Sequence, residues 1–290
     1  MNDTDLEALV EAVLQRLSAG TSSPVPARSV TTADLEACVA AARPVHEVEQ
    51  PVDAALLERL VSLTSSRIAT GRAGNRFLTD LSLRTREGQA DARDAVHSAV
   101  PEGWAKAHGL LELRTRCKDR HEYLLQPNLG RRLDDASRTL VEQQPRGGKP
   151  DVQLVVGDGL SPNAVVQNGT ELLAALRRAL AAAGLSTGLD SFVELARIGV
   201  ADELGVLSQA RATVMMVGER PGLGTGDSLS IYIAVNPRLD QDNAEKNCIS
   251  NVRPIGITAD EAAALTVQIV KRGLERGMGG VALGLGWGRA

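Results

Sequence analysis

The strongest constraint on the fold is a regular alternation of apolar runs and helical patterns in the second half of the 290-residue chain. It begins after the Gly-Gly-Lys-Pro break at residues 147–150, whose composition is typical of a domain boundary. Short apolar runs bounded by glycine or polar residues predict buried strands, and the longer periodic segments between them predict helices. In chain order, the predicted strand, helix, strand, helix and strand are residues 152–156, 170–183, 192–196, 202–209 and 213–217.

This β-α-β-α-β order predicts an α/β fold in which parallel strands are joined by right-handed crossovers. Alternating apolar residues predict a fourth strand at residues 229–235. Thr258 and Glu261 have the spacing of a capping box and predict a final helix. The segment between these two elements contains Cys248 and is predicted to be an irregular loop.

The turns that follow the predicted strands are candidate binding segments, because ligands of open parallel sheets lie beyond the carboxyl ends of the strands. The turns Gly-Asp-Gly, Arg-Ile-Gly and Gly-Glu-Arg are residues 157–159, 197–199 and 218–220. Glycine in each turn allows the backbone to approach a bulky ligand closely. We therefore expect a ligand at the glycine-rich run 217–228, with Glu219 as a contact. An ion pair with Arg197 or Arg220 is the alternative role of Glu219.

The chain before this sheet region is predicted to be mainly helical. Residues 5–19 have one apolar face and predict an amphipathic helix, which either docks on its own subunit or binds another protein. The Pro- and Ser-containing stretch after it has linker composition. We expect an amphipathic helix, a linker with an extension, a mainly helical domain with a short hairpin, and the sheet domain at residues 1–20, 21–50, 51–148 and 149–290.

Within the helical domain, a pattern rich in arginine is interrupted at residues 70–76, where two glycines break the period. Arg67, Arg72 and Arg76 cluster there, either as a solvated turn or as an interface for carboxylates of a partner. Two short strands joined as a hairpin, and then a helix after Gly130, are expected further on. The two strands are residues 110–117 and 122–126.

Composition argues against several classes of protein. A formal net charge of -4 and an aromatic content of 2% make a nucleic-acid partner unexpected. We expect no membrane span, since no apolar run reaches roughly 18 residues, and hence a cytoplasmic protein. Cys38, Cys117 and Cys248 are odd in number and widely separated, which argues against a disulfide framework or a zinc knuckle.

Known cofactor motifs are incomplete in this chain. The glycines at 222, 224 and 226 form G-x-G-x-G and do not open a predicted helix, so a dinucleotide-dependent oxidoreductase is only an alternative function. A non-catalytic assembly subunit is the other alternative. The run containing His121 resembles the cobalt-ligating D-x-H-x-x-G signature but has Leu124 in place of glycine, so we expect His121 at the surface and no metal ligand. Cys248 is expected either to be a small buried apolar residue or to pack against a flat cofactor.

Five motifs together resemble one known family. They are Thr-Gly-Arg-Ala-Gly, Asp-Gly-Leu-Ser, Val-Gly-Glu-Arg-Pro-Gly-Leu-Gly, Ser-Leu-Ser and Asn-Cys-Ile-Ser-Asn, at residues 70–74, 158–161, 217–224, 228–230 and 247–251. These runs are similar to those of the small, or light, subunit of ethanolamine ammonia-lyase, an adenosylcobalamin-dependent enzyme. The resemblance covers most of residues 50–275.

The resemblance implies a Rossmann-like sheet lobe, a hetero-oligomer with a larger barrel subunit that holds ethanolamine and most catalytic groups, and a radical conversion of ethanolamine to acetaldehyde and ammonia. It places cobalamin contacts of this chain at Ile198, Glu219 and Cys248, with Ile198 standing where the family pattern has valine. It implies neither a catalytic residue nor a metal ligand in this chain. It also implies a possible location inside a bacterial microcompartment, with the helix at residues 4–19 as the segment that binds the shell.

Overall fold

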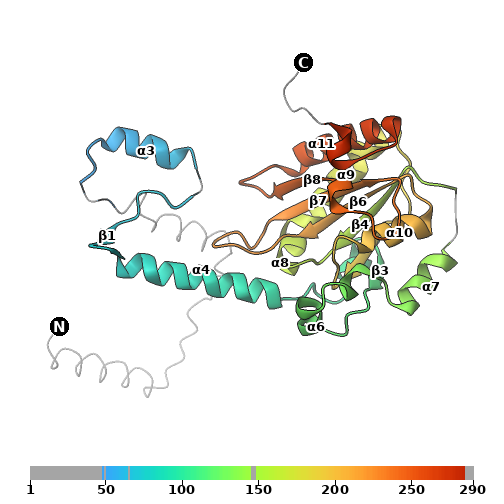
Figure 1. Cartoon of the computed structure of the whole chain (residues 1–290), viewed down its shortest axis with the longest axis horizontal. Helices are drawn as coiled ribbons and strands as arrows, with labels where there is room; N and C mark the ends of the chain where they lie inside the picture. Colours follow the sequence, from blue (N-terminus) through green and yellow to red (C-terminus); the bar gives the residue numbers. More distant parts are fainter. Residues whose placement is uncertain (1–47, 49, 65, 145–147, 285–290) are drawn as a thin grey trace, which may run out of the picture. The chain divides into compact units, whose positions relative to one another are not determined.

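The computed structural model describes residues 48, 50–64, 66–144 and 148–284, which fall into two compact units divided between Leu78 and Thr79 (Figure 1). The helix predicted at residues 5–19 lies outside the described residues. The first unit contains helix α3 (Ala54–Ser62), whose first turn is capped by the Asp53 side chain. A two-stranded antiparallel hairpin, β1 (Arg72–Ala73) and β2 (Arg76–Phe77), then explains the break in the helical pattern.

The second unit is built on a six-stranded sheet in the order β3-β5-β4-β6-β7-β8. β3, β5, β4 and β6 pair in parallel, whereas β7 and β8 continue the sheet as antiparallel strands. The predicted α/β class with a largely parallel, Rossmann-like sheet is therefore confirmed. The bounds of β3 to β8 are Leu111–Arg114, Val152–Gly157, Ser191–Glu194, Ala212–Gly218, Leu229–Val235 and Lys246–Val252.

Helices cover both faces of the central strands, which is why those strands read as continuous apolar runs. Met216 of β6 packs into a core with α9 and α11, and Met215 faces a second core with α10. Helices α4 to α11 span Thr79–His97, Trp104–Ala107, Arg120–Leu125, Asp135–Gln143, Pro162–Ala164, Thr170–Ala182, Val200–Ser208 and Ala259–Arg276. The 3₁₀ turns η1, η3 and η4 and the π-helical turn η2 span Leu129–Arg131, Asn243–Glu245, Gly280–Leu283 and Val165–Gly169.

The second strand of the hairpin predicted over residues 110–126 was wrong, because residues 120–125 form helix α6. Asp119 caps this helix by accepting a hydrogen bond from the Glu122 N–H at 2.8 Å. The Glu122 carboxylate in turn accepts from the Lys118 N–H at 2.7 Å. The polar run that resembled a hairpin turn is therefore a helix start, and β3 pairs with the distant β5 instead. His121 is exposed, as expected.

The irregular loop predicted around Cys248 was also wrong, because Cys248 lies in β8, opposite Tyr232 of β7. β8 is an edge strand whose apolar residues Ile249 and Val252 are buried toward α11. Its other residues are mostly polar, so the sequence lacks the apolar density of the central strands.

The two predictions at the carboxyl-terminal end are confirmed. β7 has the expected bounds, and Thr258 and Glu261 form the capping box of α11. The helix ends at Gly277, whose φ of 67° is the left-handed conformation typical of a helix stop. Among the helices of the described residues, none combines the length and the apolar character needed to cross a bilayer.

Candidate functional site

The turns after β4 and β6 are in direct backbone contact at the carboxyl edge of the sheet. Gly159 has a φ of +61°, and a Cβ there would overlap the carbonyl oxygen of Gly218. A Cβ on Gly218 would in turn overlap the carbonyl oxygen of Ser161. Leu160 N–H donates to the Gly218 carbonyl at 3.0 Å. Glycine is needed at both positions because the two turns approach more closely than any side chain permits.

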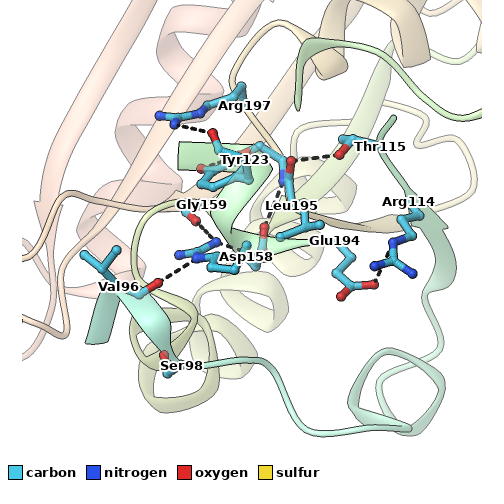
Figure 2. A network of polar contacts seen from close by, with 12 residues as sticks. Val96, Ser98, Arg114, Thr115, Tyr123, Asp158, Gly159, Glu194, Leu195 and Arg197 are labelled. Carbon is cyan, nitrogen blue, oxygen red and sulfur yellow. Dashed lines mark hydrogen bonds and ion pairs between the residues drawn. The ribbon is translucent and has the colours of Figure 1, made fainter. Parts of the chain in front are cut away.

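A buried carboxylate, Asp158, joins the turn after β4 to the turn after β5 (Figure 2). Its Oδ1 accepts from the Ala196 N–H at 2.9 Å, and its Oδ2 lies 3.5 Å from Nη1 of Arg120. Arg120 also donates to the carbonyls of Gly159 and Val96, at 2.8 and 2.6 Å. Desolvation raises the pKa of Asp158 to about 6, although the Ala196 N–H and Arg120 oppose that rise.

The turn after β5 carries Ile198 and shares hydrogen bonds with three other segments, two of which, at Thr115 and Tyr123, appear in Figure 2. Leu195 has a φ of 56°, a strained conformation for a residue other than glycine. Its carbonyl accepts from the Thr115 hydroxyl at 2.9 Å, and the next carbonyl accepts from the Tyr123 hydroxyl at 3.1 Å. The Arg197 N–H donates to the Gly130 carbonyl at 2.8 Å. Such a strained turn persists because its surroundings overdetermine it, so the backbone leading into Ile198 is preorganised.

Glu219, at the end of β6, presents a half-buried carboxylate that is anchored by its neighbours on β7 and β8. The hydroxyls of Ser228 and Ser230 donate to its two oxygens. The Asn251 N–H donates to Oε1 at 3.3 Å. Asn251 can do so because the β7–β8 pairing shifts register between Leu229 and Ile231, a bulge that turns this N–H out of the ladder.

Cys248 lies beside Glu219 on the same face of the sheet. Its thiol interacts with the hydroxyls of Tyr232 and Ser230, and Ser230 is also a donor to Glu219. Desolvation raises the pKa of the Cys248 thiol, and the two hydroxyls only partly offset this rise. Cys248 is therefore a protonated thiol at neutral pH, suited to packing and weak hydrogen bonding rather than to nucleophilic attack.

The structure brings two of the three residues predicted from the sequence together and places the third farther along the sheet. Glu219 and Cys248 are brought together through Ser230. Ile198 is half-buried at the start of α10, with the end of β4 between it and Glu219. On the face of the sheet that carries Glu219 and Cys248, α10 covers the central strands, whereas Cys248 itself is exposed.

Four residues of this surface were not singled out individually from the sequence. They are Ser228, Ser230, Tyr232 and Asn251. The spacing of Ser228 and Ser230 was a usable signal, because residues two apart on a strand share a face. The role of Asn251 depends on the bulge and had no signal in the sequence.

A cavity of about 430 Å³ lies at the opposite, amino-terminal edge of the sheet. Leu111, Gln153 and Ser191, near the starts of three parallel strands, line it together with the carboxyl-terminal end of α10. The candidate site is distinct from this cavity. It is an open surface with a fixed carboxylate acceptor, a neutral thiol and a preorganised turn, which suits a broad ligand that carries hydrogen-bond donors.

A comparison with known families gives a match that covers most of the chain. The model of the family described as ethanolamine ammonia-lyase light chain (EutC) matches residues 54–284. That range includes the described sheet and all three turns at its carboxyl edge. The chain therefore belongs to the ethanolamine ammonia-lyase light-chain family.

Proposed function

We propose that this chain is the small subunit of an adenosylcobalamin-dependent ethanolamine ammonia-lyase and forms part of the cobalamin site with Ile198, Glu219 and Cys248. The observation that carries the proposal is the pairing of Glu219 and Cys248 on one open face, with Ser230 in contact with both. Glu219 was expected as a ligand contact from its strand-end position, and the family resemblance implied the same residue.

The donors and acceptors of this surface fit a corrin. The ring carries many peripheral amides, whose N–H groups need acceptors. A carboxylate has about four lone-pair positions, and Glu219 uses three of them for Ser228, Ser230 and Asn251. One position remains for an amide of the ligand. The uncharged Cys248 and the apolar Ile198 would contact the rest of the ring. When bound, adenosylcobalamin supplies the radical chemistry, and this chain orients and shields it.

The openness of the surface supports a partner subunit. Cys248 and Ser250 are exposed, and Glu219 and Tyr232 are only half-buried. A ligand on this face would contact solvent on its other side unless a second protein surface covered it. A large catalytic subunit that holds ethanolamine would complete the site and exclude water from it.

Reconstitution tests the proposal directly. Mixing this chain with its large subunit and adenosylcobalamin should give a red complex that converts ethanolamine to acetaldehyde and ammonia. A change in nicotinamide fluorescence on binding would instead favour a dinucleotide-dependent oxidoreductase. If the complex assembled normally but the large subunit bound cobalamin equally well with and without this chain, a purely structural subunit would be favoured.

We expect Glu219→Gln to weaken cobalamin binding by the reconstituted complex by about tenfold, or about 1.4 kcal/mol. The amide loses one acceptor oxygen and the negative charge but keeps the size of the side chain. Equilibrium titration followed by cobalamin absorbance measures the effect.

Glu194→Gln is the matched control for this measurement. Glu194 is a half-buried carboxylate at the same edge, paired with Arg114 at 3.5 Å. The Glu194 side chain lies on the face of the sheet opposite to that of Glu219. Phe192, two residues earlier on β5, lies on the same face as Glu194 and packs in the core with α9. Equal affinities of the Glu219→Gln and wild-type complexes would contradict the assigned contact, and an equal loss in both variants would show a nonspecific effect of charge.

We further propose that the helix predicted at residues 4–19 directs the enzyme to the shell of a microcompartment. Its apolar stripe is suited to a groove on a partner. Deleting residues 1–20 should abolish co-sedimentation with shells while leaving ammonia-lyase activity unchanged. Unaltered sedimentation would remove this role.

A further inference from the structure

A buried ion pair joins the beginning of α10 to the beginning of β8. Lys246 Nζ lies 2.9 Å from Asp202 Oδ2, and the two side chains are 2% and 1% exposed. The ammonium group also donates to the Gln241 carbonyl at 2.9 Å and to Asn243 Oδ1 at 3.3 Å. All three of its N–H donors are therefore used.

The pair connects two of the three segments that carry the proposed cobalamin contacts, those of Ile198 and Cys248. Asp202 lies in the first turn of α10, four residues after Ile198. Lys246 lies two residues before Cys248 in β8, so the two side chains project from the same face of the strand. The separation between Ile198 and Cys248 thus depends on a contact between residues 44 positions apart.

A second carboxylate holds the other side of the same helical turn. Glu203 is 1% exposed, accepts from the Leu133 N–H at 2.8 Å and forms an ion pair with Arg138 of α7. The start of α10 is therefore fixed from two directions, by β8 through Asp202 and by the α7 segment through Glu203.

Stability alone is a poor explanation for the Lys246–Asp202 pair. Burying two charges costs free energy, and apolar residues of similar volume often stabilise a core at least as well. Desolvation raises the pKa of Asp202 despite its partner, which reflects that cost. Its second oxygen, Oδ1, is buried without a hydrogen-bond partner among the described residues. What the pair adds over apolar packing is a defined geometry between α10 and β8.

We propose that Lys246 and Asp202 are positioning residues that set the distance between Ile198 and the Glu219–Cys248 surface, and thereby the affinity of the complex for cobalamin. The inference rests on the proposed function. Neither residue needs to touch the ligand, because each acts through the segment that it holds.

The double variant Asp202→Leu/Lys246→Met tests this role in the full chain, alone and reconstituted with the large subunit. It replaces the pair with apolar side chains and leaves no unpaired buried charge. We expect a melting temperature close to that of the wild type, faster amide hydrogen exchange at residues 198–203, and about tenfold weaker cobalamin binding. If the double variant folds poorly, Asp202→Glu replaces it in the test. This variant keeps the charge but lengthens the side chain, and it should weaken cobalamin binding to a similar extent.

Arg177→Met/Asp190→Leu is the control, since it removes an ion pair of 2.6 Å just before the amino end of β5. It should leave the cobalamin affinity unchanged. Wild-type affinity and wild-type exchange in the Asp202 variants, or an equal loss of affinity in the control, would overturn the positioning role. If the wild-type complex bound no cobalamin, the proposed function would fail. The exchange rates of the chain alone would still show whether the pair fixes α10.

Discussion

Gly159→Ala is expected to lower the free energy of unfolding by about 3 kcal/mol or more. A left-handed backbone costs an alanine about 1–2 kcal/mol, and Gly159 has a φ of +61°. The added Cβ would also overlap the carbonyl oxygen of Gly218 and lie 2.8 Å from its nitrogen. Both are backbone atoms that cannot rotate away, so the two turns must separate, at a typical cost of about 1–3 kcal/mol for overpacking.

Urea unfolding followed by circular dichroism measures this loss, and Gly184→Ala is the matched control. Gly184 has a φ of +72°, but apart from its chain neighbours no atom of the described residues lies within 4 Å of the position that a Cβ would take. Gly184→Ala should therefore cost only the backbone strain, about 1–2 kcal/mol. Similar losses in the two variants would contradict the close contact between the turns after β4 and β6.

The free energy of unfolding of the wild type, relative to that of Asp158→Asn, is expected to fall by about 2 kcal/mol between pH 4 and pH 7. Desolvation raises the pKa of Asp158 from 3.8 to about 6 in the folded state. Well below pH 4 this carboxyl is protonated in both the folded and the unfolded states. Between these pH values the folded state binds more protons than the unfolded state, so its stability decreases as the pH rises. Well above pH 6 the folded state carries the full cost of a buried carboxylate.

Denaturant unfolding of both proteins at several pH values measures this difference, and Asp151→Asn supplies the contrast. A hydrogen bond from the Ser186 N–H is the largest of the effects that lower the pKa of Asp151. The contribution of Asp151 is therefore present above its unfolded pKa and is lost as the pH falls further, outside the window assigned to Asp158. A pH-independent difference between the wild type and Asp158→Asn would show that the buried carboxyl does not titrate in this range.

Elements with a strong local signal could be predicted from the sequence. The central strand β6 is apolar on both faces, and the capping box of α11 depends on two residues three positions apart. The candidate contact Glu219 followed from its place after an apolar run. Helix α6 was missed because its cap at Asp119 resembles a polar turn, and β8 was missed because most of its residues are polar.

The sequence by itself determined the α/β class, the central parallel strands and the glycine turns at their ends, because apolar periodicity and turn chemistry act over a few residues. Only the tertiary structure decided that β3 joins the sheet beside β5, that the bulge in β8 directs the Asn251 N–H to Glu219, and that Lys246 meets Asp202. Each of these contacts joins residues 32 or more positions apart. They form where burial brings two distant elements together, and the spacing of residues along the chain does not predict which elements will pair.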